Sequence, residues 1–381
     1  MFNDIELKNK ILFDPEVCVK CGYCKSNCPT YLAKLDERVS PRGRLVLSRK
    51  IYSGDLGIQD LFNFYSDLDT CSKCVECERA CPVGLKPWLN FVLVKNHTVF
   101  GKFESLFAKL ISKNEIFFKL AFSSFMNIRR YRNDQKDQGG KFESKSINSS
   151  QINDYVFVFP TCFGYTFFKN TIDKLGIILK SFGVSSSVVP KDFACCGAPI
   201  FLSGDLKSFR NHARRFSESV KKEIVDKKSG KILVFGSTCA WVMKEIFPVE
   251  AGVSISDVYE VSDYVVGLLS KQSIRQKVEP KFVSKKSRDF LLHKPCHRES
   301  SLDGFFLSFG LNFENTDFSC CGFGGSLMFK HWNMSDSLLL KTLENKKGSI
   351  VVSTSPGCII NISRKKKALH LVDFIYDILF D

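Results

Sequence analysis

The sequence predicts an α/β protein in which a mainly helical N-terminal module precedes a duplicated α/β region. Two short cysteine runs of equal spacing lie within the first 85 residues, with helical patterns between them. Further along, short continuous apolar runs alternate with helical stretches, which is typical of buried parallel strands. An order of strand, cysteine pair and strand occurs twice there, so we expect two similar halves.

The N-terminal module, residues 1–98, is defined by its two cysteine runs. They read Cys18-Val-Lys-Cys21-Gly-Tyr-Cys24-Lys-Ser-Asn-Cys28-Pro29 and Cys71-Ser-Lys-Cys74-Val-Glu-Cys77-Glu-Arg-Ala-Cys81-Pro82. In the two-cluster ferredoxin run with this spacing, three thiolates hold one [4Fe–4S] cluster and the fourth reaches the other. We therefore expect two clusters in a ferredoxin-like module, one held by Cys18, Cys21, Cys24 and Cys81 and the other by Cys71, Cys74, Cys77 and Cys28. Four-thiolate zinc is disfavoured, because zinc ribbons set their C-x2-C pairs far apart.

The stretches around the cysteine runs have the periodicity of short amphipathic helices at 44–52 and 59–68. The loop before the first of them carries Arg42 and Arg44. Positive charge near a cluster would raise its reduction potential, whereas a solvated loop would pair these arginines with Asp36 and Glu37. Both interpretations stay open from the sequence.

Residues 99–133 form a basic amphipathic segment. Apolar residues recur at helical spacing in two sets, Phe103, Leu106, Phe107 and Leu110, then Phe118, Ala121, Phe122 and Phe125. Lysines and arginines accompany them, with Arg129, Arg130 and Arg132 at the end. Such a helix can lie in an anionic membrane interface or dock on the protein's own core. Residues 134–152 are polar and aperiodic, as expected of a linker.

The duplicated region comprises residues 153–275 and 285–381. Strands are expected at 155–159, 231–235, 290–293 and 349–353, each followed closely by one cysteine, and a Cys-Cys-Gly (CCG) motif lies between the two strands of each half. The carboxyl ends of parallel strands form the ligand-binding edge of an open α/β sheet. The eight cysteines gathered there are Cys162, Cys195, Cys196 and Cys239, then Cys296, Cys320, Cys321 and Cys358.

These eight cysteines are a candidate third metal centre, an iron–sulfur cluster or zinc. The alternative is a set of buried thiols that serve as small apolar residues. His297 is either a neighbour of this centre, a ligand or a structural histidine. The stretch Gly322-Phe-Gly-Gly325 lacks the full dinucleotide-binding pattern, so we expect no flavin on this chain. No catalytic residue is assigned.

Composition and charge indicate the cellular location and the partners to expect. The chain has 381 residues, sixteen cysteines and a net charge of +15. Clustered cysteines suit metal ligation under reducing conditions, and neither a signal peptide nor a membrane-spanning run is visible, so we expect a cytoplasmic protein, peripheral on the inner face of the cell membrane. No nucleic-acid-binding motif accompanies the basic charge, so nucleic acid is not an expected partner.

The whole chain except the linker resembles the iron–sulfur subunit of glycolate oxidase. The resemblance rests on the first cysteine run with its Cys28-Pro-Thr-Tyr31 end, on Asp36-Glu37 and Pro41-Arg-Gly-Arg44, on the second run to Gly84, and on the two CCG halves. The architecture is also similar to the iron–sulfur subunit of anaerobic glycerol-3-phosphate dehydrogenase. The CCG halves are similar to lactate-utilisation proteins and to the CCG-containing subunit of heterodisulfide reductase.

The resemblance implies a complex in which an FAD-containing subunit oxidises a glycolate-like 2-hydroxy acid. This chain would relay electrons towards a membrane quinone. There are two alternatives. The chain could be a thiol or disulfide reductase similar to heterodisulfide reductase, with the CCG cysteines as its active site, or the iron–sulfur subunit of an anaerobic glycerol-3-phosphate dehydrogenase. The fullest CCG motif of the family ends in C-x2-C, but Gly236 and Ser355 stand at the first of those positions here. A [4Fe–4S] cluster, zinc, or one occupied half therefore all stay open.

Overall fold

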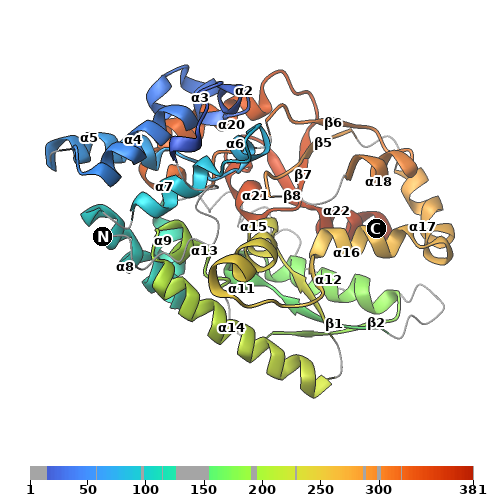
Figure 1. Ribbon diagram of the computed structural model, residues 1–381. Helices are drawn as coiled ribbons and strands as arrows, with labels where there is room; N and C mark the ends of the chain where they lie inside the picture. Colours follow the sequence, from blue (N-terminus) through green and yellow to red (C-terminus); the bar gives the residue numbers. More distant parts are fainter. Residues whose placement is uncertain are drawn as a thin grey trace. The chain divides into compact units, whose positions relative to one another are not determined.

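The computed structural model describes residues 15–56, 58–95, 98–113, 115–125, 154–189, 195–227, 230–285, 289–297, 302–318 and 320–380. It is a mixed α/β structure with two compact units (Figure 1). Unit 1 comprises residues 1–108, 201–205 and 320–342, and unit 2 comprises residues 109–200, 206–319 and 343–381. The expected linker at 134–152 and the three arginines at 129, 130 and 132 lie outside the described residues.

Unit 1 is helical. Its elements are η1 (Pro15–Val17), α2 (Tyr23–Ser26), α3 (Pro29–Lys34), η2 (Glu37–Val39), α4 (Pro41–Ser53), α5 (Ile58–Asp69), α6 (Glu76–Arg79), α7 (Pro87–Lys95), most of α8 (Val99–Lys113), α19 (Leu327–Lys330) and most of α20 (Trp332–Leu343). The helices expected at 44–52 and 59–68 are confirmed as α4 and α5. Helix α4 begins where the Ser40 hydroxyl accepts a hydrogen bond from Gly43 N and ends at Gly54 in the left-handed region.

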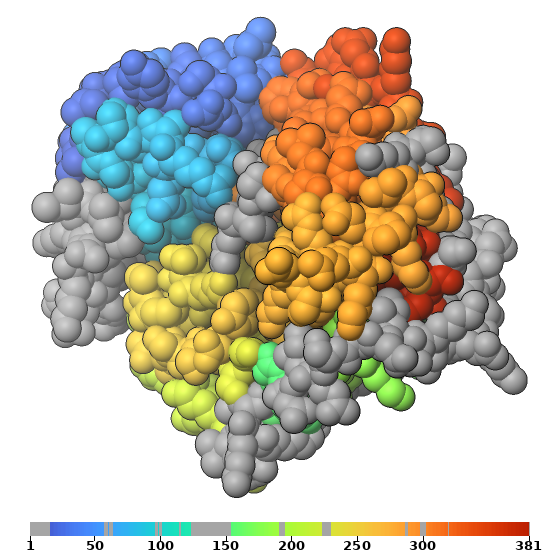
Figure 2. Space-filling model, turned by 90° about the vertical axis from the view of Figure 1, so that its right-hand side faces the viewer, coloured from blue at the N-terminus to red at the C-terminus, as the bar shows by residue number. Residues whose placement is uncertain are grey.

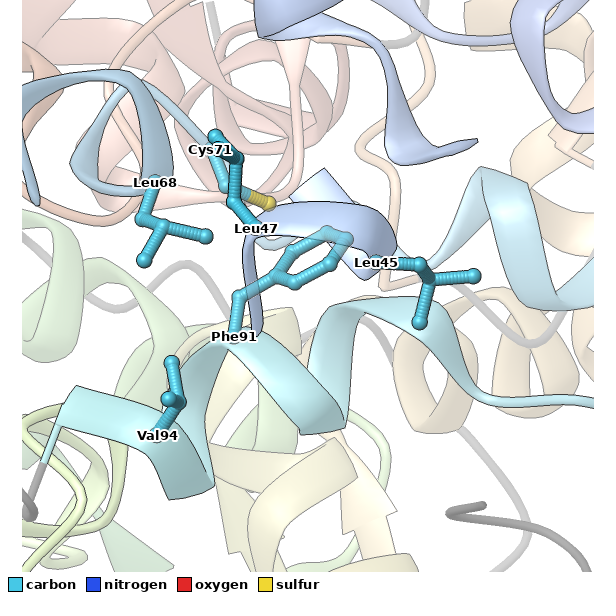
Figure 3. Close-up of a cluster of buried hydrophobic side chains, with 6 residues drawn as sticks. All are labelled: Leu45, Leu47, Leu68, Cys71, Phe91 and Val94. Carbon is cyan, nitrogen blue, oxygen red and sulfur yellow. The ribbon is translucent and has the colours of Figure 1, made fainter. Parts of the chain in front are cut away.

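The core of unit 1 joins α4, α5 and α7 to the second cysteine run. Its buried members are Leu45, Leu47, Leu68, Cys71, Phe91 and Val94 (Figure 3). Cys71 therefore lies within packed apolar side chains rather than on a solvated loop. In the space-filling view, the blue and cyan parts of unit 1 adjoin each other (Figure 2). The helices thus hold the cysteine loops in a packed framework.

Among its described residues, unit 2 contains two four-stranded parallel sheets with the same topology. The first sheet has the order β2 (Val184–Val188), β1 (Asp154–Phe159), β3 (Lys231–Val234), β4 (Val258–Glu260). The second has the order β6 (Phe313–Asn315), β5 (Phe290–His293), β7 (Ile350–Ser353), β8 (Lys367–His370). Strands β1, β3, β5 and β7 are the four that the sequence predicts, and the repeated order confirms the duplication.

Helices surround and join these sheets. They are α9 (Glu115–Phe125), α11 (Thr161–Phe167), α12 (Lys169–Ser181), α13 (Ala198–Leu202, at the border of the two units), α14 (Leu206–Lys227), α15 (Ser237–Trp241), the π-helical segment η4 (Val242–Ala251), α16 (Val261–Ser270), α17 (Gln272–Ser284), α18 (Leu302–Ser308), α21 (Pro356–Ile362) and α22 (Leu371–Phe380). Helices α12 and α16 of the first half pack on α22 of the second (Figure 1). Within this contact, Thr171 Oγ1 donates to Asp373 at 2.8 Å. No described helix is both long and apolar enough to cross a bilayer.

Candidate metal centres

The two cysteine runs fold into loops with matching backbone conformations. Lys20 and Lys73, the residues before the second cysteine of each run, have φ angles of 56° and 59°. Gly22 and Val75, the residues after it, have φ angles of 86° and 60°. A β-branched residue rarely adopts the left-handed region, so Val75 is held there by the surrounding loop. The repeated spacing therefore reflects a repeated three-dimensional turn.

Each loop receives its fourth cysteine from the other loop. Cys18, Cys21, Cys24 and Cys81 line one cavity. Cys28, Cys71, Cys74 and Cys77 line a second cavity. Four convergent thiols match the ligand number of a [4Fe–4S] cluster. The donor sets therefore fit the two expected clusters, with the same exchange of fourth ligands that the spacing predicts.

The first cavity is the more solvated one, and two cations beside it share one carboxylate. Arg42 Nε donates to Glu37 at 2.7 Å, and Lys25 Nζ lies 2.8 Å from the other oxygen of the same carboxylate. Arg42 also donates to the carbonyl of Lys20 at 3.3 Å. Burial and the neighbouring thiols raise the pKa of Cys24 to about 11, so metal binding must displace its proton.

The second cavity is buried, and Arg44 reaches it through a threonine. The Arg44 guanidinium donates to Thr30 Oγ1 at 3.2 Å, to Thr70 Oγ1 at 2.6 Å and to the carbonyl of Asp67 at 3.0 Å. Thr30 Oγ1 lies 3.2 Å from Cys28 Sγ. Hydrogen bonds to ligand sulfurs tune a cluster's potential. Arg42 thus belongs to a partly solvated ion pair, whereas Arg44 is a buried neighbour of a candidate ligand.

Lys73 is a second buried cation, and its charge acts on Cys71. Its exposed fraction is 1%, and it directly follows the Cys71-Ser72 pair. Burial alone would raise the pKa of Cys71, but Lys73 and Arg44 together hold it below its usual value. These charges therefore favour the metal-binding thiolate form of Cys71, whereas burial raises the pKa of Cys77 well above its usual value.

The glycine-rich stretch 322–325 has a packing role in unit 1. A Cβ atom on Gly324 would lie 2.3 Å from the carbonyl oxygen of Ser72, and one on Gly325 would lie 2.5 Å from that of Cys71. Only glycine permits so close an approach to the second cysteine loop. The stretch thus supports a candidate cluster site rather than a nucleotide.

In the first half of unit 2, the sheet edge brings the four expected thiols together. Cys196 Sγ lies 2.9 Å from Cys239 Sγ, and Gly197 N donates to Cys195 Sγ at 3.3 Å. Burial, with the charges of the neighbouring thiols, raises the pKa of Cys162 well above its usual value. The preceding Thr161 has a φ angle of 64°, a strained conformation at the turn between β1 and α11. These donors fit a soft metal or cluster.

The second half differs. Cys358 is buried in α21, whereas Cys320 and Cys321 belong to unit 1. His293, which sequence reasoning did not single out, has a ring nitrogen within 4.8 Å of Cys358 Sγ. The sequence does contain a signal for this residue: His293 is a polar residue at the end of an otherwise apolar strand, three positions before Cys296.

His297 packs against an aromatic side chain and a threonine, and the described cysteines are free thiols. The ring of His297 stacks on Trp241 at 4.3 Å between centroids, and its Nδ1 lies 3.1 Å from Thr238 Oγ1. These contacts favour the structural role among those open from the sequence. All sixteen cysteines are described, and none forms a disulfide.

The comparisons with known proteins agree with this organisation. The model of the 4Fe-4S dicluster domain matches residues 15–85, and that of the cysteine-rich domain matches residues 156–244 and 308–363. The chain thus contains one segment similar to a 4Fe-4S dicluster domain and two similar to a cysteine-rich domain, a combination that indicates an iron–sulfur protein.

The curated relatives place it more narrowly. The chain is 23% identical to the glycolate oxidase iron-sulfur subunit of Escherichia coli K12, over 90% of this chain and 88% of that protein. It is 25% identical to lactate utilization protein A 2 of Bacillus cereus Q1, over 57% of this chain and 94% of that protein. It is also 23% identical to a subunit of the dihydromethanophenazine:CoB–CoM heterodisulfide reductase of Methanosarcina barkeri, over 97% of this chain and 93% of that protein. The chain is similar to each of these proteins over more than half of its length.

Proposed function

We propose that this chain is the electron-relay subunit of a complex in which a flavoprotein oxidises a glycolate-like 2-hydroxy acid and a membrane quinone accepts the electrons. The observation that carries the proposal is the pair of cavities, each lined by four cysteines drawn from both runs. The relatives named for glycolate oxidase and lactate utilization support the substrate class. Two [4Fe–4S] clusters, when bound, supply one-electron transfer.

The chain's own residues hold and separate the two sites. Eight thiolates provide the ligands, while Arg44, Thr30 and Lys73 place positive charge and hydrogen bonds beside the second site. The core around Cys71 keeps water from that site, whereas Cys21 is exposed at the first. This difference in solvation favours the first site as the point of contact with a redox partner, because electron transfer needs a short approach.

The heterodisulfide reductase relative supports a second candidate, a thiol or disulfide reductase acting at the CCG cysteines. Cys195 and Cys320 are each 4% exposed. A substrate disulfide must reach a reactive sulfur, so this burial favours the relay.

Anaerobic purification with the co-purifying flavoprotein tests the proposed function. We expect iron and labile sulfide at about eight each per chain from the two four-iron clusters, or more if a further cluster is bound. Glycolate or lactate should then produce the EPR signal of reduced clusters, and a C21A/C74A variant should not show it. Zinc without labile sulfide would contradict the relay, and disulfide reduction without any flavoprotein would establish the second candidate.

We propose further that α8 and α9 each rest on an anionic membrane surface. The apolar face of α8 is exposed, with Phe103 at 68%, and α9 exposes Ile116 at 68%. The opposite side of α9 docks on the protein, where Phe118 packs against Phe163 at 5.3 Å between ring centroids. Exposed lysines, Lys102, Lys113 and Lys119, accompany the apolar residues. Exposed apolar residues with cations favour an interface rich in acidic lipids.

Vesicle sedimentation tests this surface. The triple variant F103S/L106S/F107S is expected to lose most binding to vesicles that contain phosphatidylglycerol, because its apolar contact is removed. Neutralising Lys102 and Lys113 should weaken binding by about 1 kcal/mol per lysine, an effect that salt suppresses in the wild type. The matched control L307S removes an equally exposed residue of α18 and should bind normally. Equal binding by the triple variant would refute the proposal.

A further inference from the structure

The carboxyl edge of the second sheet contains a buried histidine with one unused ring nitrogen. His293 is fully buried at the end of β5. Its Nδ1 lies 3.0 Å from Thr316 Oγ1, while its Nε2 has no hydrogen-bond partner in the described part of the chain. An unsatisfied buried nitrogen is costly, so a ligand at Nε2 would remove a real penalty.

The hydrogen bonds around His293 fix its tautomer. The Thr316 hydroxyl donates its one hydrogen to the carbonyl of Phe318 at 3.3 Å. Thr316 Oγ1 must then accept from Nδ1–H of His293, which leaves the lone pair on Nε2. Metal-binding histidines are held in this way, by a donor contact at the nitrogen that does not bind the metal.

The other buried strand-end histidine of this sheet provides a contrast. His370 ends β8, and its Nε2 lies 3.0 Å from the carbonyl oxygen of Thr354. Its Nδ1 accepts from Val372 N at 3.2 Å. Both ring nitrogens of His370 are used within the fold, so His370 is structural and His293 is not explained in the same way.

A thiol lies close to the imidazole ring of His293. The nearest ligand atoms of His293 and Cys358 are within 4.8 Å of each other, and both residues belong to unit 2. Cys358 lies in the first turn of α21, directly after β7, and β7 pairs with β5 in the register His293↔Ser353. A nitrogen and a sulfur bound to one metal ion are at most about 4.3 Å apart, since the two bonds are about 2.0 and 2.3 Å long, so a small side-chain adjustment suffices for both to bind one ion.

We propose that the second half binds a metal centre with mixed nitrogen and sulfur ligation, through His293 Nε2 and Cys358 Sγ. Imidazole with thiolate suits zinc or an iron ion of comparable softness. Cys296, three residues after His293, is a further ligand candidate within unit 2. The first half has Phe159 at the position equivalent to His293, three residues before Cys162. The two halves therefore diverge in ligand chemistry, with thiols alone in the first half and a mixed donor set in the second.

Replacement of His293 in the full-length protein tests the site. The variant H293F installs the residue of the first half and should lose one metal equivalent by elemental analysis, together with the imidazole scattering in X-ray absorption at the zinc or iron edge. The variant H293C should keep the metal but lose the imidazole scattering. T316V should weaken metal retention by about 10–100-fold, because it removes the contact that orients the ring.

The control is H297F, which removes the histidine stacked on Trp241 and should leave the metal content and spectrum unchanged. A far-UV circular dichroism spectrum and a urea unfolding midpoint equal to those of the wild type show that unit 2 of each variant folds. If H293F keeps the metal and its spectrum, or if the wild type shows no imidazole-bound metal, the inference is wrong. These outcomes are independent of the relay function, which depends on the other unit's cysteine runs.

Discussion

Replacing Cys81 with alanine is expected to remove the cluster whose other three ligands lie more than fifty residues earlier in the sequence. Cys81 lines the cavity of Cys18, Cys21 and Cys24, although it belongs to the second run. Loss of one thiolate leaves one iron of that cluster without its protein ligand, which destabilises the cluster. Iron should therefore fall from about eight to about four per chain, and one of the two EPR signals should disappear.

The comparison of four alanine variants makes this test specific. If the fourth ligands exchange, C81A and C21A should lose the same EPR signal, and C28A and C74A should both lose the other one. If each run holds its own cluster instead, C81A will match C74A. The pairing of spectra decides between these arrangements even if a damaged cluster retains some iron.

The second large effect is expected for Asp69, a carboxylate with 1% exposure at the end of α5. Its oxygens contact Lys95 and Ser326, and Lys330 Nζ lies 3.4 Å away. Lys95 Nζ is also 2.7 Å from Glu104. D69N would leave the buried Lys95 ammonium without its main counter-charge. We expect a loss of about 3–5 kcal/mol in the free energy of unfolding, measured by urea denaturation.

The contribution of Asp69 to the free energy of unfolding depends on pH in a definite direction. Burial alone would raise the pKa of Asp69, but Lys95 and the neighbouring cations hold it far below its usual value. This carboxylate therefore stabilises the fold above pH ~4, and the stabilisation is lost as the pH falls towards the lowered pKa. In D69N, the free energy of unfolding should therefore fall less between about pH 4 and 2 than it does in the wild type. The control D317N removes a half-exposed partner of Lys346 and should cost less than about 1 kcal/mol. An equal cost for both variants would contradict the buried-pair argument.

The sequence predicts the elements that depend on local patterns. Repeated cysteine spacing indicates the two loops, and the apolar runs before single cysteines indicate β1, β3, β5 and β7. Helical periodicity locates α4 and α5 to within a few residues. These predictions succeed because a motif or a period encodes each one within a short window.

Features that depend on distant contacts were not predictable in the same way. The apolar sets of the basic segment look alike in sequence, but Phe103 is exposed while Phe118 is buried against α11. Arg42 and Arg44 are two positions apart, and only the fold separates a partly solvated ion pair from a buried cation. The role of His293 depends on Thr316 and Cys358, which lie on other elements.

The close contact between the glycine stretch and the second cysteine loop has a consequence for how the protein is made. Gly324 and Gly325 lie against the backbone of Ser72 and Cys71, and residues 320–342 belong to the same unit as the cysteine runs. They leave the ribosome after about 240 more residues have been added beyond Cys81, roughly 10–50 s later at common synthesis rates. During that interval the second loop lacks this cover. Cofactor delivery to the second loop can therefore precede its closure, and a chain truncated after residue 98 would keep all eight cysteines yet lack the cover that completes this unit.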